Sequence, residues 1–200
     1  MSYCPARTRQ PTLALLALDG RLAELVRKKR EPILAQMRLA WWRDTLEKDP
    51  SDWPRGDPVL AALSEWPDRA ALIDLVNGWE RLLGETLDEA AVTEFANGRG
   101  VAFAALSHRI GEAQAAPLAV RAGYVWALGD LAANLRDAQE RALVVELGRA
   151  GTPLASLPRA LRPLTVLAGL ARQSLSRGGT PLLEGPASGL LALRLGVTGR

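Results

Sequence analysis

Apolar residues recur at the three- and four-residue spacing of an α-helix through most of the chain, between short segments rich in proline and glycine. This periodicity indicates helices, because residues at these spacings share one helical face. Leucine, alanine, arginine and glutamate are frequent, whereas β-branched residues, which favour strands, are few. The sequence therefore predicts an all-α protein of about eight or nine helices with no strand.

Capping and turn residues divide the chain into these helices. Pro32 suits a first helical turn, and Asp68 is an expected N-cap. Gly98 and Gly100 lie inside an expected helix and predict close contact with a neighbouring helix. The expected helices, with approximate ends, cover residues 12–29, 32–47, 58–65, 69–83, 86–109, 115–147, 157–176 and 186–195, and helix 115–147 is long or kinked.

The length of 200 residues fits a single domain with a sizeable core. We expect an N-terminal tail over residues 1–11, a helical domain over 12–176, and a linker with a short C-terminal helix over 177–200. The linker is expected at Arg177-Gly178-Gly179-Thr180-Pro181, because glycine and proline interrupt helices.

The net charge and the cysteine content argue against several kinds of function and site. The net charge of +3 is too small to indicate nucleic-acid binding. Cys4 is the single cysteine, so we expect neither an internal disulfide nor a cysteine-based zinc site. The chain shows no signal-peptide pattern and no run of about 18 uninterrupted apolar residues. The expected location is the cytoplasm, and peripheral contact with the inner membrane surface stays open.

The expected second helix contains the run Arg38-Leu39-Ala40-Trp41-Trp42-Arg43-Asp44. At about 100° per residue, Trp41, Trp42 and their apolar neighbours spread over one broad face with Arg38 at its middle. Arg38 is therefore expected either to be buried with an anionic partner or to extend its head along the tryptophan faces. The second arrangement would gain roughly 0.5–2 kcal/mol of cation–π energy. In the first, Arg38→Ala destabilises the fold.

The expected first helix carries a carboxylate on its apolar face. Asp19 lies among Leu15, Leu22 and Val26 when the residues are placed at about 100° per step. A carboxylate in such a place needs a cation or hydrogen-bond donors. Asp19 is therefore the first candidate partner for Arg38.

The segment 123–137 places Asp130, Asn134 and Asp137 on one helical face. Oxygen ligands two turns apart could hold Mg²⁺, which binds a few carboxylates and keeps several waters. The structural alternative is that Asp130 and Asp137 pair with Arg38 or another arginine across helices. Loss of one partner of such a buried pair typically costs about 3–5 kcal/mol.

Several of these segments together resemble a known family. The most specific is Arg38-Leu39-x-Trp41-Trp42-Arg43, where x is any residue, and supporting segments are Arg30-Glu31-Pro32, Pro58-Val59-x-Ala61-x-Leu63, Phe95-Ala96-x-x-Arg99-Gly100, Leu128-Gly129 and Leu135-Arg136-Asp137. This set resembles the squalene/phytoene synthase family over about residues 12–176. The likeness is greatest to a short, divergent branch that includes mitochondrial complex I assembly-factor-like proteins.

The resemblance implies an all-α isoprenoid synthase fold, in which two aspartate-rich helices face each other across a cavity and hold Mg²⁺ against prenyl diphosphates. The chain departs from that pattern in both helices. Where an active member has its first aspartate cluster, it carries Ala23-Glu24-Leu25-Val26-Arg27. In the second motif Asp137 is kept, but Arg141 replaces the later aspartate. Ionising an allylic diphosphate needs several carboxylates that hold divalent ions, and most of that cluster is missing.

We therefore expect a squalene/phytoene synthase-like domain that has lost metal-dependent catalysis. It would act as a binding or assembly factor, either similar to those of respiratory complex I or related to isoprenoids, with no cofactor. The expected partner is a protein, or a prenyl diphosphate or isoprenoid lipid. The alternative is an active Mg²⁺-dependent prenyltransferase that joins two prenyl diphosphates head to head, with Asp130 and Asp137 as metal ligands. The candidate residues for diphosphate binding or a buried network are Asp19, Arg38, Trp41, Trp42, Asp130, Asn134, Arg136 and Asp137.

Overall fold

The computed structural model describes residues 5–27, 32–150 and 155–199. These ranges contain helices and turns and no strand, which confirms the expected all-α class. Cys4, Arg30 and Glu31 lie outside the described residues. The α-helices are α1 (Ala6–Arg27), α2 (Pro32–Glu47), α3 (Pro58–Leu63), α4 (Arg69–Arg81), α5 (Glu89–Arg109), α6 (Ala116–Asn134), α7 (Ala138–Arg149), α8 (Arg162–Ser176) and α9 (Gly185–Thr198). Three short 3₁₀ helices connect them: η1 (Pro50–Asp52), η2 (Ala113–Ala115) and η3 (Arg159–Leu161).

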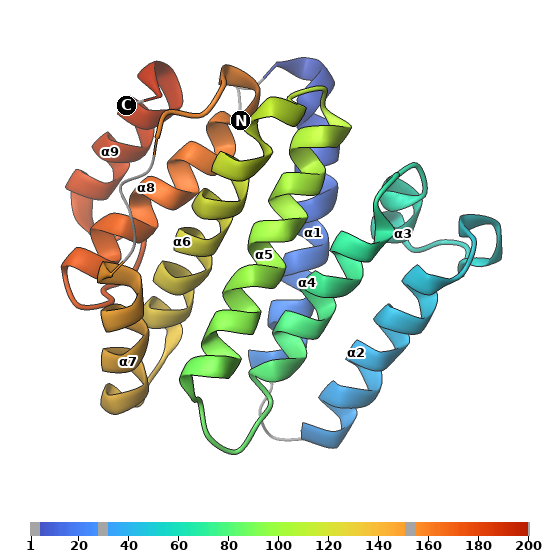
Figure 1. The fold of residues 1–200 in the computed structure, drawn as a ribbon, viewed down its shortest axis with the longest axis horizontal. Coiled ribbons are helices and arrows are strands. Elements are labelled where there is room, and N and C mark those ends of the chain that lie inside the picture. Colours follow the sequence, from blue (N-terminus) through green and yellow to red (C-terminus); the bar gives the residue numbers. More distant parts are fainter. Residues whose placement is uncertain (1–4, 28–31, 151–154, 200) are drawn as a thin grey trace.

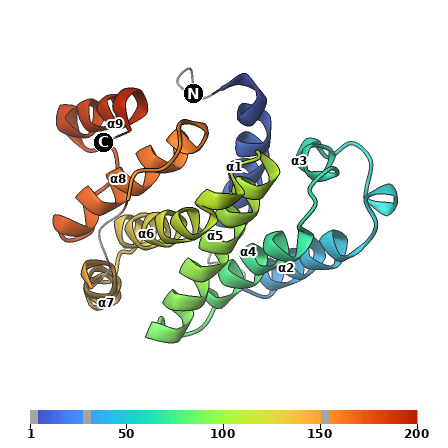
Figure 2. The same cartoon turned by 45° about the horizontal axis from the view of Figure 1, so that its top comes forward.

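Helix α5 is the centre of the molecule (Figure 1). It packs against α4 on one side and α6 on the other, and α1 lies behind α4 and α5. Helices α8 and α9 extend the array beyond α6, whereas α2 forms the opposite edge and packs mainly on α4 (Figure 2). The largest fully buried side chains include Phe95 and Phe103 of α5, so the core is centred on this helix.

Several helix ends follow from capping side chains. Asp68 accepts a hydrogen bond from the amide of Ala71 at 3.2 Å, which confirms it as the N-cap of α4. Asp57 and Asp88 cap α3 and α5 in the same way. Each cap satisfies amide donors that the first helical turn leaves without a partner.

Three boundaries differ from the sequence prediction. Helix α1 begins at Ala6, so much of the expected tail is helical, although Pro11 removes one amide donor from it. The expected helix 115–147 is two helices, because the backbone is extended at Leu135 and Asp137. The expected linker 177–181 is a hydrogen-bonded turn in which the amide of Gly179 donates to the carbonyl of Ser174 at 2.9 Å.

Two glycines of α5 let its neighbours approach closely. A Cβ atom at Gly98 would lie 2.5 Å from the carbonyl oxygen of Asp74 in α4. A Cβ atom at Gly100 would lie 2.8 Å from the carbonyl oxygen of Val120 in α6. Close contact at Gly98 and Gly100 is therefore confirmed, and it brings α4 and α6 against α5 on either side of Arg99.

No helix within the described ranges is long and apolar enough to cross a membrane.

Candidate functional site

A buried ionic network joins α1, α5 and α6. Arg99 of α5 is 2% exposed, and its Nε and Nη2 donate to the two carboxylate oxygens of Asp19, each at 2.8 Å. Nη2 also lies 2.9 Å from Oδ2 of Asp130 in α6. The indole Nε1 of Trp79 donates to Oδ1 of Asp19 at 2.9 Å. One guanidinium therefore connects two carboxylates that are far apart in sequence.

Aromatic rings enclose this guanidinium. Its central carbon lies 4.1 Å from the ring centroid of Trp126 and 4.9 Å from those of Trp79 and Phe95. Nη1 of Arg99 has no hydrogen-bond partner among the described residues, and the ring faces supply electrostatic attraction in its place. Burial lowers the pKa of Arg99, but attraction to Asp19 and Asp130 outweighs it and raises that pKa. Arg99 stays charged.

Asp130 connects the network to an open cleft of about 1120 Å³. The cleft lies between the C-terminal end of α1, the segment joining α4 to α5, and the segment joining α6 to α7. Trp79 and Phe95, which contact Arg99, also line it, so the buried network is adjacent to its wall. Its other lining residues include Val26, Arg27, Arg81, Leu82, Glu85, Leu87, Leu131, Asn134, Leu135, Arg136, Asp137 and Glu140.

The oxygens of Asp130 already have partners. Oδ2 is paired with Arg99, and Oδ1 lies 3.2 Å from the side-chain nitrogen of Asn134. That nitrogen also donates to the backbone carbonyl of Asp130 at 2.8 Å. Asn134 is exposed, and it therefore stabilises the last turn of α6 at the edge of the cleft.

Asp137 is the N-cap of α7. Its Oδ1 accepts hydrogen bonds from the amides of Gln139 and Glu140, at 2.8 and 2.9 Å. Asp137 is exposed, as is Arg136 beside it, and both line the cleft. Because α6 ends before it, Asp137 is not in helical register with Asp130, and the expected single face through these residues is wrong.

Arg141 fixes the connection between α6 and α7. Its Nε and Nη2 donate to the carbonyl oxygen of Leu135 at 3.3 and 2.8 Å, and Nη2 also donates to that of Arg136 at 3.3 Å. These carbonyls lie in the turn that follows α6. Arg141 therefore has a structural role in this protein, because it holds the turn after α6.

Asp130 and Asp137 do not form the Mg²⁺ site that the sequence predicted as one alternative. In the described part of the chain, no three His, Cys, Asp or Glu side chains are grouped so that they could hold a metal ion. Asp130 has both oxygens engaged, and Asp137 has one oxygen engaged in capping. A divalent ion would have to displace these partners.

The structure corrects the expected partner of Asp19. Asp19 is buried as predicted, but Arg99 and Trp79 bind it, and Arg38 does not. Arg38 is exposed on α2, so its predicted burial is wrong. The buried face of α2 is formed by Ala35, Leu39, Trp42, Thr45 and Leu46. Trp42 belongs to this face, whereas Trp41 is 43% exposed.

Sequence reasoning missed Arg99 as a functional or structural centre. The signal was present, because a single arginine stands between two glycines in the apolar run of residues 95–106. Glycines on both sides of a charged residue indicate that other helices come close to it. Phe95 lies four residues before Arg99 on the same helix, so the sequence places it beside Arg99. Trp79 and Trp126 come from α4 and α6, and their closeness depends on how the helices pack.

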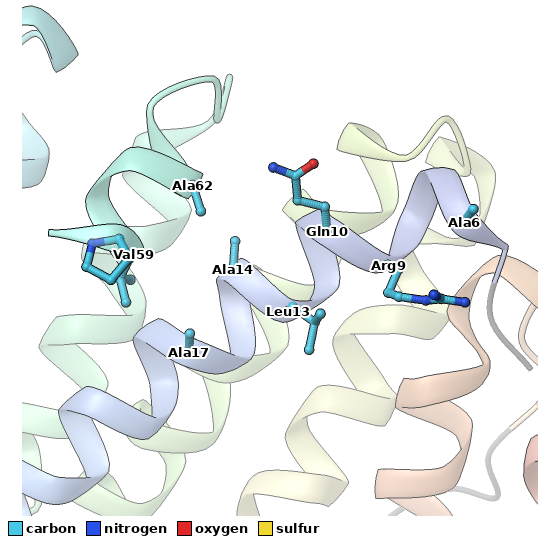
Figure 3. A pocket seen from close by; sticks show the side chains of 9 residues that line it. Ala6, Arg9, Gln10, Leu13, Ala14, Ala17, Val59 and Ala62 are labelled. Atoms are coloured by element: carbon cyan, nitrogen blue, oxygen red, sulfur yellow. The ribbon is translucent and has the colours of Figure 1, made fainter. Parts of the chain in front are cut away.

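A second hollow, of about 420 Å³, lies between α1 and α3 (Figure 3). Ala14 of α1 and Ala62 of α3 face it, and Leu13 is exposed beside it. Arg9 is its one ionisable lining residue among those described. This hollow offers an apolar surface without an arrangement of reactive groups.

The cleft brings together the end of α1 and the start of α7, since Val26 and Arg27 line it with Asp137. The family model described as squalene/phytoene synthase matches residues 1–142. The chain belongs to the squalene/phytoene synthase family. In this family member the matched region runs from α1 into α7 and contains the whole Asp19–Arg99–Asp130 network.

Comparison with curated proteins gave no match, and comparison with solved structures gave none either.

Proposed function

We propose that this squalene/phytoene synthase family member is a non-catalytic binding protein, whose cleft holds an anionic isoprenoid ligand without ionising it. The observation that carries the proposal is the engagement of Asp130. Its two oxygens are occupied by Arg99 and Asn134, so this carboxylate contributes to the fold rather than to a metal cluster.

The composition of the cleft supports an isoprenoid ligand with an anionic head. Apolar side chains such as Leu87, Phe95 and Leu131 can contact a hydrocarbon chain. Arg27 and Arg136 are both exposed in the cleft, and arginine binds phosphate oxygens in a bidentate manner. The head group would therefore lie between the end of α1 and the turn after α6.

The chemistry of diphosphate ionisation supports binding without turnover. A diphosphate leaving group has to be neutralised by divalent ions, and several carboxylates are needed to hold those ions. Here Arg27 and Arg141 stand where carboxylates would be expected, and Arg141 is bound to backbone carbonyls. Arg27 and Arg136, which line the cleft, can neutralise a bound diphosphate but supply no metal.

A role as an assembly factor is the finer part of the proposal. It rests on the resemblance to complex I assembly-factor-like members, and a protein partner would contact the domain while the cleft holds its ligand. Peripheral contact with a membrane surface is compatible with this role, because isoprenoid lipids are taken from membranes.

Calorimetry with a farnesyl diphosphate analogue, with and without Mg²⁺, tests the proposal. We expect binding that does not need Mg²⁺ and that weakens at least about tenfold in Arg136→Ala, through loss of one charge-assisted contact. Arg172→Ala is the matched control, because Arg172 is an exposed arginine of α8 outside the cleft.

Two results would contradict the proposal. Binding that requires Mg²⁺ and is lost in Asp137→Asn would favour the active prenyltransferase and justify product assays. Absence of binding in every condition, with the protein folded, would leave protein assembly as the role.

A further inference from the structure

Helix α9 presents apolar side chains on the side that faces solvent. Leu190, Leu193 and Val197 are 68%, 63% and 67% exposed. At about 100° per residue these three side chains share one narrow arc of the helix, and the exposed Pro186 lies in the same arc. A helix at the surface of a protein normally carries polar residues on this side. We call Pro186, Leu190, Leu193 and Val197 the outer face of α9.

The outer face is not part of the core. The opposite side of α9 carries its buried residues, Ser188, Leu195 and Gly196. Leu195 packs with Val166 and Leu170 of α8 in a small apolar cluster that is separate from the main core. Helix α9 lies at the edge of the helical array and packs mainly on α8 (Figures 1 and 2). None of the described residues covers its outer face.

Positive charge is concentrated at this end of the chain. Residues 155–199 contain five arginines and one acidic residue, Glu184, at the N-cap of α9. The arginines are Arg159, Arg162, Arg172, Arg177 and Arg194. This is an excess of four positive charges, whereas the whole chain has a net charge of +3, so the other residues together add none. This end of the chain therefore attracts anionic surfaces.

Two of the arginines belong to α9 or contact it. Arg194 is exposed and borders the outer face, next to Leu190 when the residues are placed at about 100° per step. Nη1 of Arg162 in α8 donates to the carbonyl oxygen of Leu195 at 3.4 Å, near the carboxyl end of α9. Neither α8 nor α9 contains an acidic residue. Exposed apolar and cationic groups thus occur together, as in helices that lie on anionic membranes.

We propose that the outer face of α9 binds a lipid bilayer that contains anionic phospholipids. The helix lies parallel to the bilayer surface, with Leu190, Leu193 and Val197 among the upper parts of the acyl chains. Arg194 contacts a lipid phosphate, and the other exposed arginines add longer-range attraction. At 14 residues α9 is about 21 Å long, shorter than a bilayer core of about 30 Å, so it lies on the membrane and does not cross it.

The same residues disfavour a protein as the occupant. A two-fold contact between two copies of the outer face would bring two arginine-rich surfaces together, and like charges repel. The residues that dominate protein interfaces are tryptophan, tyrosine and arginine, whereas leucine and valine are under-represented. The outer face is purely aliphatic and has no side-chain hydrogen-bonding group. Lipid acyl chains match this surface because they require no directional contact.

Co-sedimentation of the full chain with phosphatidylcholine vesicles that contain about 30% phosphatidylserine tests the proposal. We expect binding that weakens at least about tenfold on vesicles of phosphatidylcholine alone, and that also weakens between about 0.1 and 0.5 M salt. Leu190→Glu combined with Leu193→Glu should lower the lipid affinity at least about tenfold, because the outer face then carries two carboxylates.

The matched control is Ile33→Glu combined with Met37→Glu in α2. These two side chains are as exposed as Leu190 and Leu193, and they lie at the opposite edge of the array. The control changes the total charge by the same amount, so it should retain binding close to that of the wild type. Circular dichroism checks that each variant is folded.

A single arginine variant tests the electrostatic part. Arg194→Gln should weaken binding to the phosphatidylserine vesicles about fivefold and make it less sensitive to salt, since each arginine near an anionic surface contributes separately. Arg55→Gln, at an exposed arginine in the turn before α3, should leave both unchanged.

Three results would overturn the proposal: a folded wild type that does not sediment with the vesicles, binding that the α9 double variant keeps, or equal loss of binding in the α2 double variant. A wild type that forms dimers in sedimentation velocity, and loses them in the α9 double variant, would assign the outer face to a second copy instead. The vesicles contain no isoprenoid, so the outcome is independent of the proposed binding function.

Discussion

Arg99 and Arg38 both lie in helices and both are near tryptophans, Arg99 in the folded structure and Arg38 in the sequence. One of the two arginines is buried and the other is exposed. Arg99 is 2% exposed, with two carboxylates and three aromatic rings around it. Arg38 is exposed on a helix that packs mainly against one other. Glycines on both sides of Arg99 let α4 and α6 close over it, whereas Arg38 has Met37 and Leu39 as neighbours. Burial of an arginine thus depends on how many helices can approach it.

The largest effect that tests this comparison is expected from Arg99→Ala. It leaves Asp19 and Asp130 without their cation in a poorly solvated site, so we expect a loss of about 3–5 kcal/mol in the free energy of unfolding. Arg38→Ala, the matched control, should cost less than about 0.5 kcal/mol. Urea unfolding measures both.

Folding raises the pKa of Arg99, and the direction of this shift decides how the charge of Arg99 affects the stability of the protein as the pH changes. A pKa raised on folding gives stability that is fully present below the ordinary arginine pKa and is lost only as the pH rises through the higher, folded value. The deprotonation of Arg99 should therefore add no pH dependence to the wild-type stability between about pH 6 and 9. A larger loss in the free energy of unfolding from Arg38→Ala than from Arg99→Ala would refute the comparison between the two arginines.

A smaller effect is expected within the network itself, where the two carboxylates are not equivalent. Asp19 accepts two hydrogen bonds from Arg99 and one from Trp79, whereas Asp130 is less buried and accepts one from Arg99. Asp19→Asn should cost about 2–3 kcal/mol, because an amide cannot accept all three. Asp130→Asn should cost less than about 1 kcal/mol, because Arg99 keeps its charge partner in Asp19. Equal costs in thermal and urea unfolding would show that Asp130 contributes as much as Asp19.

The smallest effect is expected at the surface pair Arg43–Glu80, which links α2 to α4. Nη1 of Arg43 lies 2.6 Å from Oε2 of Glu80, and the hydrogen bond raises the pKa of Arg43. Both side chains are partly exposed, so a double-mutant cycle should give a coupling of about 0.5–1 kcal/mol that declines in 1 M salt. A coupling that salt leaves unchanged would mean that the pair is shielded from solvent like the Arg99 network.

The sequence alone predicted much of the fold and less of the site. Asp68, as a capping residue at the head of an amphipathic segment, marks the start of α4 from local signals. Arg38 was misplaced because the apolar residues of α2 cover too wide a face, including the exposed Leu34 and Trp41. A residue at the middle of such a wide apolar face does not have to point towards the core. Asp19 could be recognised as buried, but its partner Arg99 is 80 residues away and depends on how α1 and α5 pack.

The contacts of Arg141 determine which substitutions the turn after α6 can tolerate. Its acceptors are the main-chain carbonyls of Leu135 and Arg136, which any residue at those two positions would also provide. Binding these two carbonyls at once needs a side chain with several hydrogen-bond donors on one planar group. Among the amino acids, arginine has such a group. In a library selected for folding, position 136 should therefore accept many residues and position 141 very few, although both are arginine today.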